Sequence, residues 1–189
     1  MSALLKKIFI EDEEFAGKFK KSSAAKSVHH AFIGGLLEHT LSVTDNCNYM
    51  AGHYPVLNRD LLITVALLHD IGKTKEYSLF PENDYTDDGN LLGHIVIGAQ
   101  MIEKAAESIP DFPPVLKSEI EHCILSHHGK LEYGSPKVPS IVEAVALNYA
   151  DDMDAKLEIF TEIADYTVSK DWLGFNRFLD SNIRLTRGE

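Results

Sequence analysis

Apolar residues recur along most of this chain at the spacing of three to four positions that is typical of amphipathic helices. Residues 36–51 are an example, because apolar or small side chains at Leu37, Leu41, Thr44, Cys47 and Ala51 fall on one helical face. Proline and glycine residues interrupt the pattern between such segments. The pattern predicts helices over residues 36–51, 60–71, 94–109, 115–128 and about 140–165.

Local signals indicate where two of these helices begin and end. Asp60 is a good N-cap for the segment 60–71, and Gly72 is a good C-cap. Ser140 and Glu143 have the spacing of a capping box at the start of the last long helix.

Two segments lack the helical spacing of apolar residues. Residues 75–93 mix aromatic residues with Pro, Asn, Asp and Gly, which predicts a small β-hairpin or an ordered loop. The aromatic-rich stretch 171–185 is interpreted as one more short helix that packs on the body. Because no repeat, low-complexity tract or linker divides residues 1–189, we expect a single all-α domain with one small β-like excursion.

Composition narrows the partners and the location. The formal net charge is −11, with 18 basic and 29 acidic residues, so no basic face for a nucleic-acid backbone is evident. This favours a small substrate, or a strand end that enters a metal site. No apolar run reaches the roughly 18 residues that span a bilayer, and the N-terminus lacks a secretory signal, so we expect a cytoplasmic protein. Cys47 and Cys123 are expected to be reduced, buried thiols.

Seven ionisable residues lie inside or at the ends of the apolar, helix-like segments. Such groups are costly there unless they are paired or bound to metal. Five imidazoles and two carboxylates would suit two divalent transition metals, with Fe, Mn, Zn, Ni and Co as the candidates. Two metals about 3.5–4 Å apart can activate water and neutralise a phosphoryl group. The predicted ligands are His39, His69, Asp70, His94, His127, His128 and Asp151.

These residues, with LLHDIGK at 67–73 and SHHG at 126–129, resemble the HD-domain metal-dependent phosphohydrolases. The segment SVHHAFIGGLLEHTLSV at 27–43 is similar to the HD domain of YhaM-type 3′–5′ exoribonucleases, and the resemblance covers about residues 27–160. It implies an HD-domain helical bundle. It also implies that His39, His69, Asp70 and Asp151 hold one metal, and that Asp70, His94, His127 and His128 hold the other.

In this scheme Asp70 bridges the two metals, and Lys73 matches a lysine near the substrate phosphate, so Asp70 and Lys73 are the expected catalytic residues. YhaM-type enzymes also carry an N-terminal OB-like domain. Only about 30 residues precede the match here, so we expect that platform for single strands to be absent.

Several functions remain open at this point. The leading hypothesis is a two-metal phosphohydrolase acting on a nucleotide or on the 3′ end of a single-stranded nucleic acid. A cyclic-dinucleotide phosphodiesterase, a non-catalytic nucleotide-sensing module and a di-iron oxygenase are the alternatives. The aromatic C-terminal segment could also serve as a homo-oligomer interface.

A few neighbouring residues are candidates for a supporting role. His29 and His30 precede the first core helix and are interpreted as capping groups or as partners of a metal ligand. Asp152 and Asp154 fit a solvated acidic face, although Asp154 lies one helical turn from Asp151 and could support the site.

Overall fold

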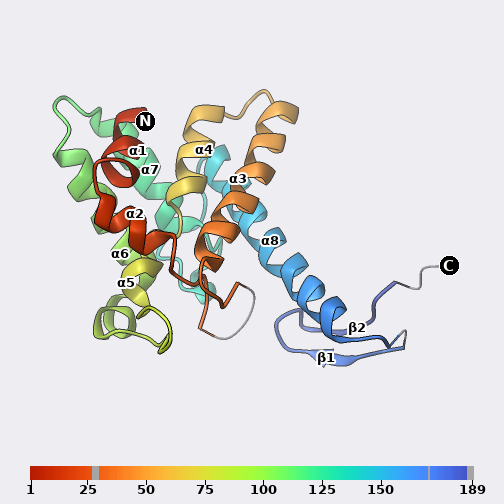
Figure 1. The fold of residues 1–189 in the computed structure, drawn as a ribbon. Helices are drawn as coiled ribbons and strands as arrows, with labels where there is room; N and C mark the ends of the chain where they lie inside the picture. Colours follow the sequence, from red (N-terminus) through yellow and green to blue (C-terminus); the bar gives the residue numbers. More distant parts are fainter. Residues whose placement is uncertain (27–29, 170, 187–189) are drawn as a thin grey trace.

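The computed structural model describes residues 1–26, 30–169 and 171–186, and within them the all-α prediction is confirmed (Figure 1). His29 lies outside the described residues. The helices, in chain order, are α1 (Ser2–Phe9), α2 (Glu13–Phe19), α3 (Gly35–His53), α4 (Arg59–Leu68), α5 (Lys73–Glu76), α6 (Asp87–Glu107), α7 (Pro114–Ser126), the 3₁₀ turn η1 (Leu131–Tyr133) and α8 (Val142–Tyr166). Two short strands follow, β1 (Gly174–Asn176) and β2 (Ser181–Ile183).

The helix α4 lies at the centre of the bundle, in contact with α3, α7 and α8. Its apolar residues are buried on nearly all sides, as expected for a helix that is surrounded by other helices. Each fully buried leucine or isoleucine contributes roughly 1.5–3 kcal/mol relative to exposure. The core residues with no exposed surface include Leu36, Leu62, Leu68, Ile71, Ile120, Ile124 and Leu147. The C-terminal end of α4 therefore lies within the buried core of the protein.

The helix predicted at 60–71 is present as α4, but both predicted end signals are wrong. The N-cap of α4 is Asn58, whose side chain accepts a hydrogen bond from the Leu61 N–H, so Asp60 lies in the first turn instead. Gly72 is not a left-handed C-cap, because its φ of −62° is helical. A glycine is required there for another reason: a Cβ at this position would lie 2.0 Å from the carbonyl oxygen of His94.

The predicted capping box at the start of α8 is wrong. The N-cap is Ile141, and Ser140 makes no side-chain bond to the helix. The Glu143 carboxylate instead accepts a hydrogen bond from the backbone N–H of Asn58 at 2.7 Å. The Glu143 carboxylate is thus bonded to a distant backbone N–H and not to the start of its own helix. The end of this helix at Tyr166 agrees with the prediction of about 165.

Only residues 77–86 of the segment predicted at 75–93 form an ordered loop, because α5 ends at Glu76 and α6 already begins at Asp87, seven residues before the predicted helix start at 94. A single antiparallel bridge between Tyr77 and Tyr85 closes the loop, and the Ser78 N–H donates to the Asp84 carbonyl oxygen next to it. No ladder extends from the bridge among the described residues. The loop brings the end of α5 next to the start of α6.

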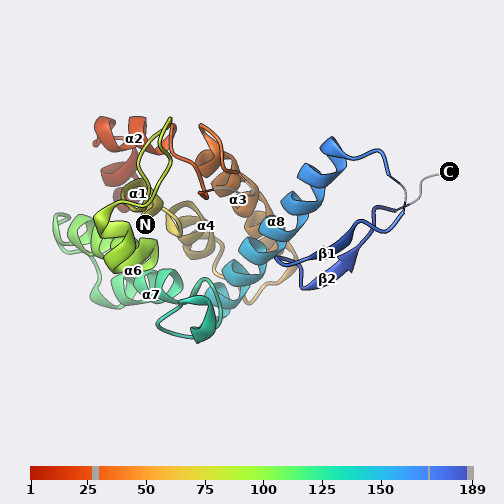
Figure 2. The same ribbon diagram turned by 90° about the horizontal axis from the view of Figure 1, so that it is seen from below.

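The helix predicted at 171–185 is wrong, because this segment forms the antiparallel hairpin of β1 and β2. The Asn176 side chain accepts hydrogen bonds from the N–H groups of Phe178 and Leu179, and Asp180 has a φ of +46°. These turn features are incompatible with a continuous helix. Figure 2 shows the hairpin beside the outer half of α8, on the opposite side of the molecule from α1, α2 and α6.

None of the described helices is both long enough and apolar enough to cross a membrane.

Candidate metal centre

The structure brings all seven predicted ligand residues together near the end of α4. His69 is the C-cap of α4 and Asp70 is the next residue, so both lie at the buried C-terminal end of that helix. His39 comes from α3, and Asp151 from α8. The remaining three residues are histidines. His94 lies within α6, and His127 and His128 lie at the C-terminal end of α7.

Four of these residues form a first cluster, which we call cluster A. Its members are His39, His69, Asp70 and Asp151. His39 Nε2 lies 3.2 Å from His69 Nε2 and 3.2 Å from Asp151 Oδ1. Asp70 Oδ2 lies 3.3 Å from His69 Nε2 and 3.4 Å from His39 Nε2.

The other histidines form cluster B with the same aspartate. His94, His127 and His128 each offer a ring nitrogen, and these three nitrogens lie within 4.8 Å of one another. Asp70 Oδ1 lies 3.5 Å from His94 Nε2 and 3.7 Å from His127 Nε2. One oxygen of Asp70 therefore faces cluster A and the other faces cluster B.

Hydrogen bonds fix which nitrogen each histidine can offer. In all five rings Nδ1 lies within hydrogen-bond distance of a carbonyl or carboxylate oxygen, which can only accept, so Nδ1 carries the hydrogen and donates it. The Nε2 lone pair of each neutral ring is then free to bind a metal. The acceptors are Asp154 for His39, Ala66 O for His69, Glu76 for His94, Ile124 O for His127 and Tyr133 O for His128.

Several buried atoms at the centre lack hydrogen bonds. Among the described residues, Asp70 Oδ1 and the Nε2 atoms of His94 and His127 have no hydrogen-bond partner, whereas Asp70 Oδ2 is paired with the Lys73 ammonium. Asp70 is only 2% exposed. Orphaned buried polar atoms cost free energy, whereas metal ions would satisfy these atoms with the ligand types that they prefer. The residues present therefore fit divalent metals.

The charges at the centre favour ionised carboxylates and neutral rings of His127 and His128. Burial alone would raise the pKa of Asp70, but the Lys73 ammonium and His69 outweigh it and hold that pKa well below its usual range. The pKa of Asp151 is lowered as well, because its hydrogen bond with His39 and the charge of His69 outweigh burial. Burial and neighbouring histidines lower the pKa of His127 and His128. These are the protonation states that bind metal.

His39 differs from these two histidines. Burial alone would lower its pKa, but hydrogen bonds with Asp151, Asp154 and Asp70 outweigh burial and raise the pKa well above the usual value. A proton on His39 balances the carboxylates around it. A metal in cluster A would replace this proton as the balancing charge.

Side chains outside the two clusters hold the ligands in place. Asp154 is buried and also accepts hydrogen bonds from the Ser42 hydroxyl and from His30 Nε2, the latter at 3.3 Å. Asp154 is therefore the hydrogen-bond partner of the candidate ligand His39, and His30 bonds to Asp154. Asp152 instead lies on the exposed face of α8 and pairs with Lys156 at 2.6 Å.

Glu76 is a buried partner of the candidate ligand His94 that the sequence reasoning missed. Its Oε1 accepts hydrogen bonds from the backbone N–H and from Nδ1 of His94. Glu76 stands in the charged stretch Lys73–Glu76, where nothing in the sequence separates it from a solvent-exposed residue. Only the tertiary contact between α5 and α6 reveals its role.

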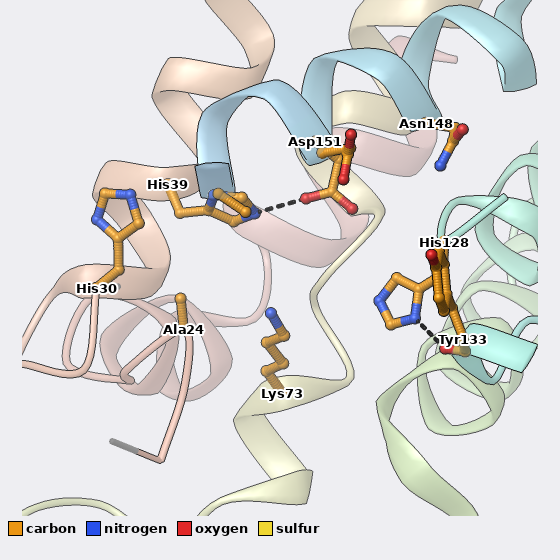
Figure 3. Close-up of a pocket in the computed structure, with 10 residues that line it drawn as sticks. Ala24, His30, His39, Lys73, His128, Tyr133, Asn148 and Asp151 are labelled. Atoms are coloured by element: carbon orange, nitrogen blue, oxygen red, sulfur yellow. Dashed lines mark hydrogen bonds and ion pairs between the residues drawn. The ribbon is translucent and has the colours of Figure 1, made fainter. Parts of the chain in front are cut away.

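A pocket of about 200 Å³ opens onto the metal centre (Figure 3). Lys73 lines it, and Lys73 Nζ lies 2.7 Å from Asp70 Oδ2. Figure 3 shows His128, Tyr133 and Asn148 on one side of the pocket and His30 and His39 on the other. The pocket lining consists of Ala24, His30, His39, Lys73, His128, Tyr133, Asn148, Asp151, Asp152 and Ala155.

Comparisons with known proteins agree with this architecture. Residues 36–156 match the HD domain family. The chain is 46% identical over 143 residues to the 3′–5′ exoribonuclease YhaM of Bacillus subtilis, covering 75% of this chain and 45% of that protein. The YhaM exoribonuclease of Bacillus velezensis is 45% identical over 146 residues, which cover 77% of this chain and 46% of the relative. That of Bacillus pumilus is 40% identical over 155 residues, with coverages of 82% and 49%.

This chain therefore spans about half the length of the curated relatives that it matches. No solved structure gave a significant match.

Proposed function

The chain belongs to the HD-domain family, a family of metal-dependent hydrolases, and on this premise we propose that it hydrolyses phosphodiester bonds at the 3′ end of a single-stranded nucleic acid with two divalent metal ions. The observation that carries the proposal is the position of Asp70. Its two carboxylate oxygens face two separate sets of imidazole nitrogens, at 3.3–3.4 Å and 3.5–3.7 Å. A single carboxylate placed in this way suits two metals rather than one.

Cluster A would hold one metal and cluster B the other, with Asp70 shared between them. Fe, Mn, Zn, Ni and Co all suit such a set of imidazoles and carboxylates. Bound metals of this kind supply an activated water and neutralise the charge of a phosphoryl group.

The other residues of the pocket bind and orient the substrate. Lys73 is largely buried and carries a positive charge beside Asp70, on the pocket wall. Burial alone would lower its pKa, but Asp70 and Asp151 outweigh burial and raise it, so Lys73 stays charged. A fixed ammonium group stabilises charge that develops on phosphate oxygens.

The substrate class follows from the size of the pocket, the net charge and the relatives. A net charge of −11 disfavours a long path along a polyanion. A small pocket over the metal centre suits the end of a strand. The three Bacillus relatives are named as 3′–5′ exoribonucleases. Their activity favours RNA 3′ ends over cyclic dinucleotides and free nucleotides as the substrate.

Metal analysis combined with a substrate panel tests the proposal. The purified chain, reconstituted with Mn²⁺ or Fe²⁺, is expected to hold two metal equivalents and to shorten a 5′-labelled oligoribonucleotide from its 3′ end. Asp70→Asn should lose both metals and the activity, while Asp60→Asn, on the exposed first turn of α4, should keep both. Less than one equivalent of metal in the wild-type chain contradicts two sites.

The panel also includes a cyclic dinucleotide and deoxynucleoside triphosphates. Turnover of only one of these would replace the proposed substrate class. Thermal stabilisation by a nucleotide without any turnover would point to a sensor instead.

A further inference from the structure

The loop between α7 and α8 is built on a candidate metal ligand. The backbone N–H of His128 donates to Ser135 Oγ at 3.1 Å, and its ring Nδ1 donates to the Tyr133 carbonyl oxygen at 2.9 Å. Gly129 and Gly134 have φ values of +78° and +90°, which allow the chain to turn tightly at each end of the loop. The position of Tyr133 is therefore fixed relative to His128.

The Tyr133 side chain is an exposed aromatic group at the pocket. It lines the pocket, yet 59% of the residue surface is open to solvent. Lys130 Nζ lies 5.1 Å from the ring centroid. A cation beside an aromatic ring is a common feature of surfaces on which bases stack.

Asn148 makes the same side of the pocket rigid. Its Nδ2 donates to the His127 carbonyl oxygen at 2.7 Å. A Cβ at position 129 would lie 2.6 Å from the Asn148 side chain, so only glycine allows the loop to pass this closely. The loop after α7, the helix α8 and the histidines at the end of α7 therefore form one rigid wall of the pocket.

The volume of the pocket limits what it can enclose. About 200 Å³ is less than the roughly 300–1,000 Å³ of pockets that surround a whole drug-sized ligand. A phosphate and sugar at the metal centre would leave the attached base at the rim. Tyr133 lies on that rim (Figure 3).

We propose that Tyr133 stacks on the nucleobase of the terminal nucleotide of a single-stranded substrate. This subsite rests on the proposed function and specifies how it selects a strand end. Every base has a π-face, so stacking recognises a nucleotide without reading its sequence. Clusters A and B would hold the metals beside the phosphate and Lys73 would contact it, while Tyr133 positions the base.

Steady-state kinetics on a labelled oligoribonucleotide test this subsite. Tyr133→Ala should raise KM by roughly 5- to 150-fold, the range expected for loss of one stacked base, with kcat and metal content little changed. Tyr133→Phe, which retains the ring, should restore KM. Leu131→Ala is the matched control, because Leu131 is exposed on the same turn but does not line the pocket.

A second oligomer with an abasic 3′-terminal nucleotide separates stacking from loop damage. The wild-type chain and Tyr133→Ala should have similar KM values on the abasic oligomer, so the two changes should not add. Equal KM values for the two proteins on the normal oligomer, or an equal loss on both oligomers, would overturn the subsite alone. A metal-loaded wild-type chain that cleaves no oligomer would overturn the proposed function, and the subsite with it.

Discussion

Glu76 Oε1 accepts two hydrogen bonds from His94, one from the backbone N–H at 3.0 Å and one from ring Nδ1 at 3.1 Å. The two residues are 18 positions apart, and Glu76 is only 5% exposed. The carboxylate fixes both the backbone and the ring of His94, so that Nε2 faces Asp70. Burial alone would raise the pKa of Glu76, but its bonds to His94 outweigh burial and lower it.

Removing this carboxylate should therefore weaken cluster B. We expect Glu76→Ala to lower the affinity for one of two metals by about 10- to 100-fold, as is usual when the partner of a ligating histidine is lost. Competition with a chromogenic chelator measures the two affinities. Glu82→Ala, at an exposed position of the adjacent loop, is the control. Unchanged affinity in Glu76→Ala would show that His94 does not depend on this contact.

Gly93 makes the contact between Glu76 and His94 possible. Its φ of +72° and ψ of +157° interrupt α6 immediately before His94 and free the His94 N–H for Glu76. This region of backbone space is essentially restricted to glycine. Gly93→Ala should destabilise the chain by about 1–3 kcal/mol, as measured by urea unfolding. Gly17→Ala, in the interior of α2 with open space around it, should be neutral or stabilising. Equal effects of both changes would contradict this account.

Asp154 has the corresponding role for His39 in cluster A. Its Oδ2 lies 2.7 Å from His39 Nδ1, and the Ser42 hydroxyl and His30 also donate to this carboxylate. Asp154→Asn should reduce affinity at one metal site by about 10-fold or more, because an amide is a weaker acceptor than a carboxylate. Asp165→Asn, at an exposed position near the C-terminal end of α8, should have no effect. Isothermal titration with Mn²⁺ distinguishes the two variants.

The seven ligand candidates could be predicted because each one interrupts or ends an apolar helical segment. A histidine or aspartate in such a place is costly by itself, so its presence indicates a partner. Asp154 carries only its spacing of one helical turn from Asp151, in the same charged run, and Glu76 carries no signal. They stand among other charged residues, in DDMD and in KTKE, and their burial depends on how α3 packs with α8 and α5 with α6.

The helix predicted for the C-terminal segment 171–185 was wrong for a different reason. The aromatic content of this segment suggested a packing helix, but Trp172 and Phe175 are largely exposed, so these side chains do not anchor a helix on the core. Local turn chemistry at Asn176 and Asp180 decides the conformation instead. The start of α8 shows the opposite case, because a distant backbone N–H at Asn58 takes the side chain that a local cap would have used.

The two cysteines give a prediction about pH. Burial raises the pKa of Cys47 and of Cys123 from about 9 to about 12. At pH 8 the thiolate fraction of each is then about a thousandfold lower than in the unfolded chain. A disulfide reagent should therefore react with neither thiol in the native chain and with both in urea. Rapid labelling of the native chain at pH 8 would contradict the burial of these thiols.

The same shifts predict a loss of stability in alkaline solution. Between pH 9 and pH 12 the unfolded chain loses protons from both thiols while the folded chain retains them. The free energy of unfolding should therefore decrease as the pH rises through this window. Replacing both cysteines with alanine should remove this contribution to the pH dependence.

Lys73 and a bound metal would share the task of balancing Asp70. The Lys73 ammonium lies 2.7 Å from a carboxylate that is 2% exposed. Lys73→Met should destabilise the metal-free chain by on the order of 3 kcal/mol, because it leaves a buried charge without its ion pair. Bound divalent metals neutralise the same carboxylate, so the deficit should shrink in saturating Mn²⁺. Urea unfolding with and without metal measures both values, and Lys75→Met, exposed on the same short helix, is the control. An equal deficit in both conditions would mean that metal does not reach Asp70.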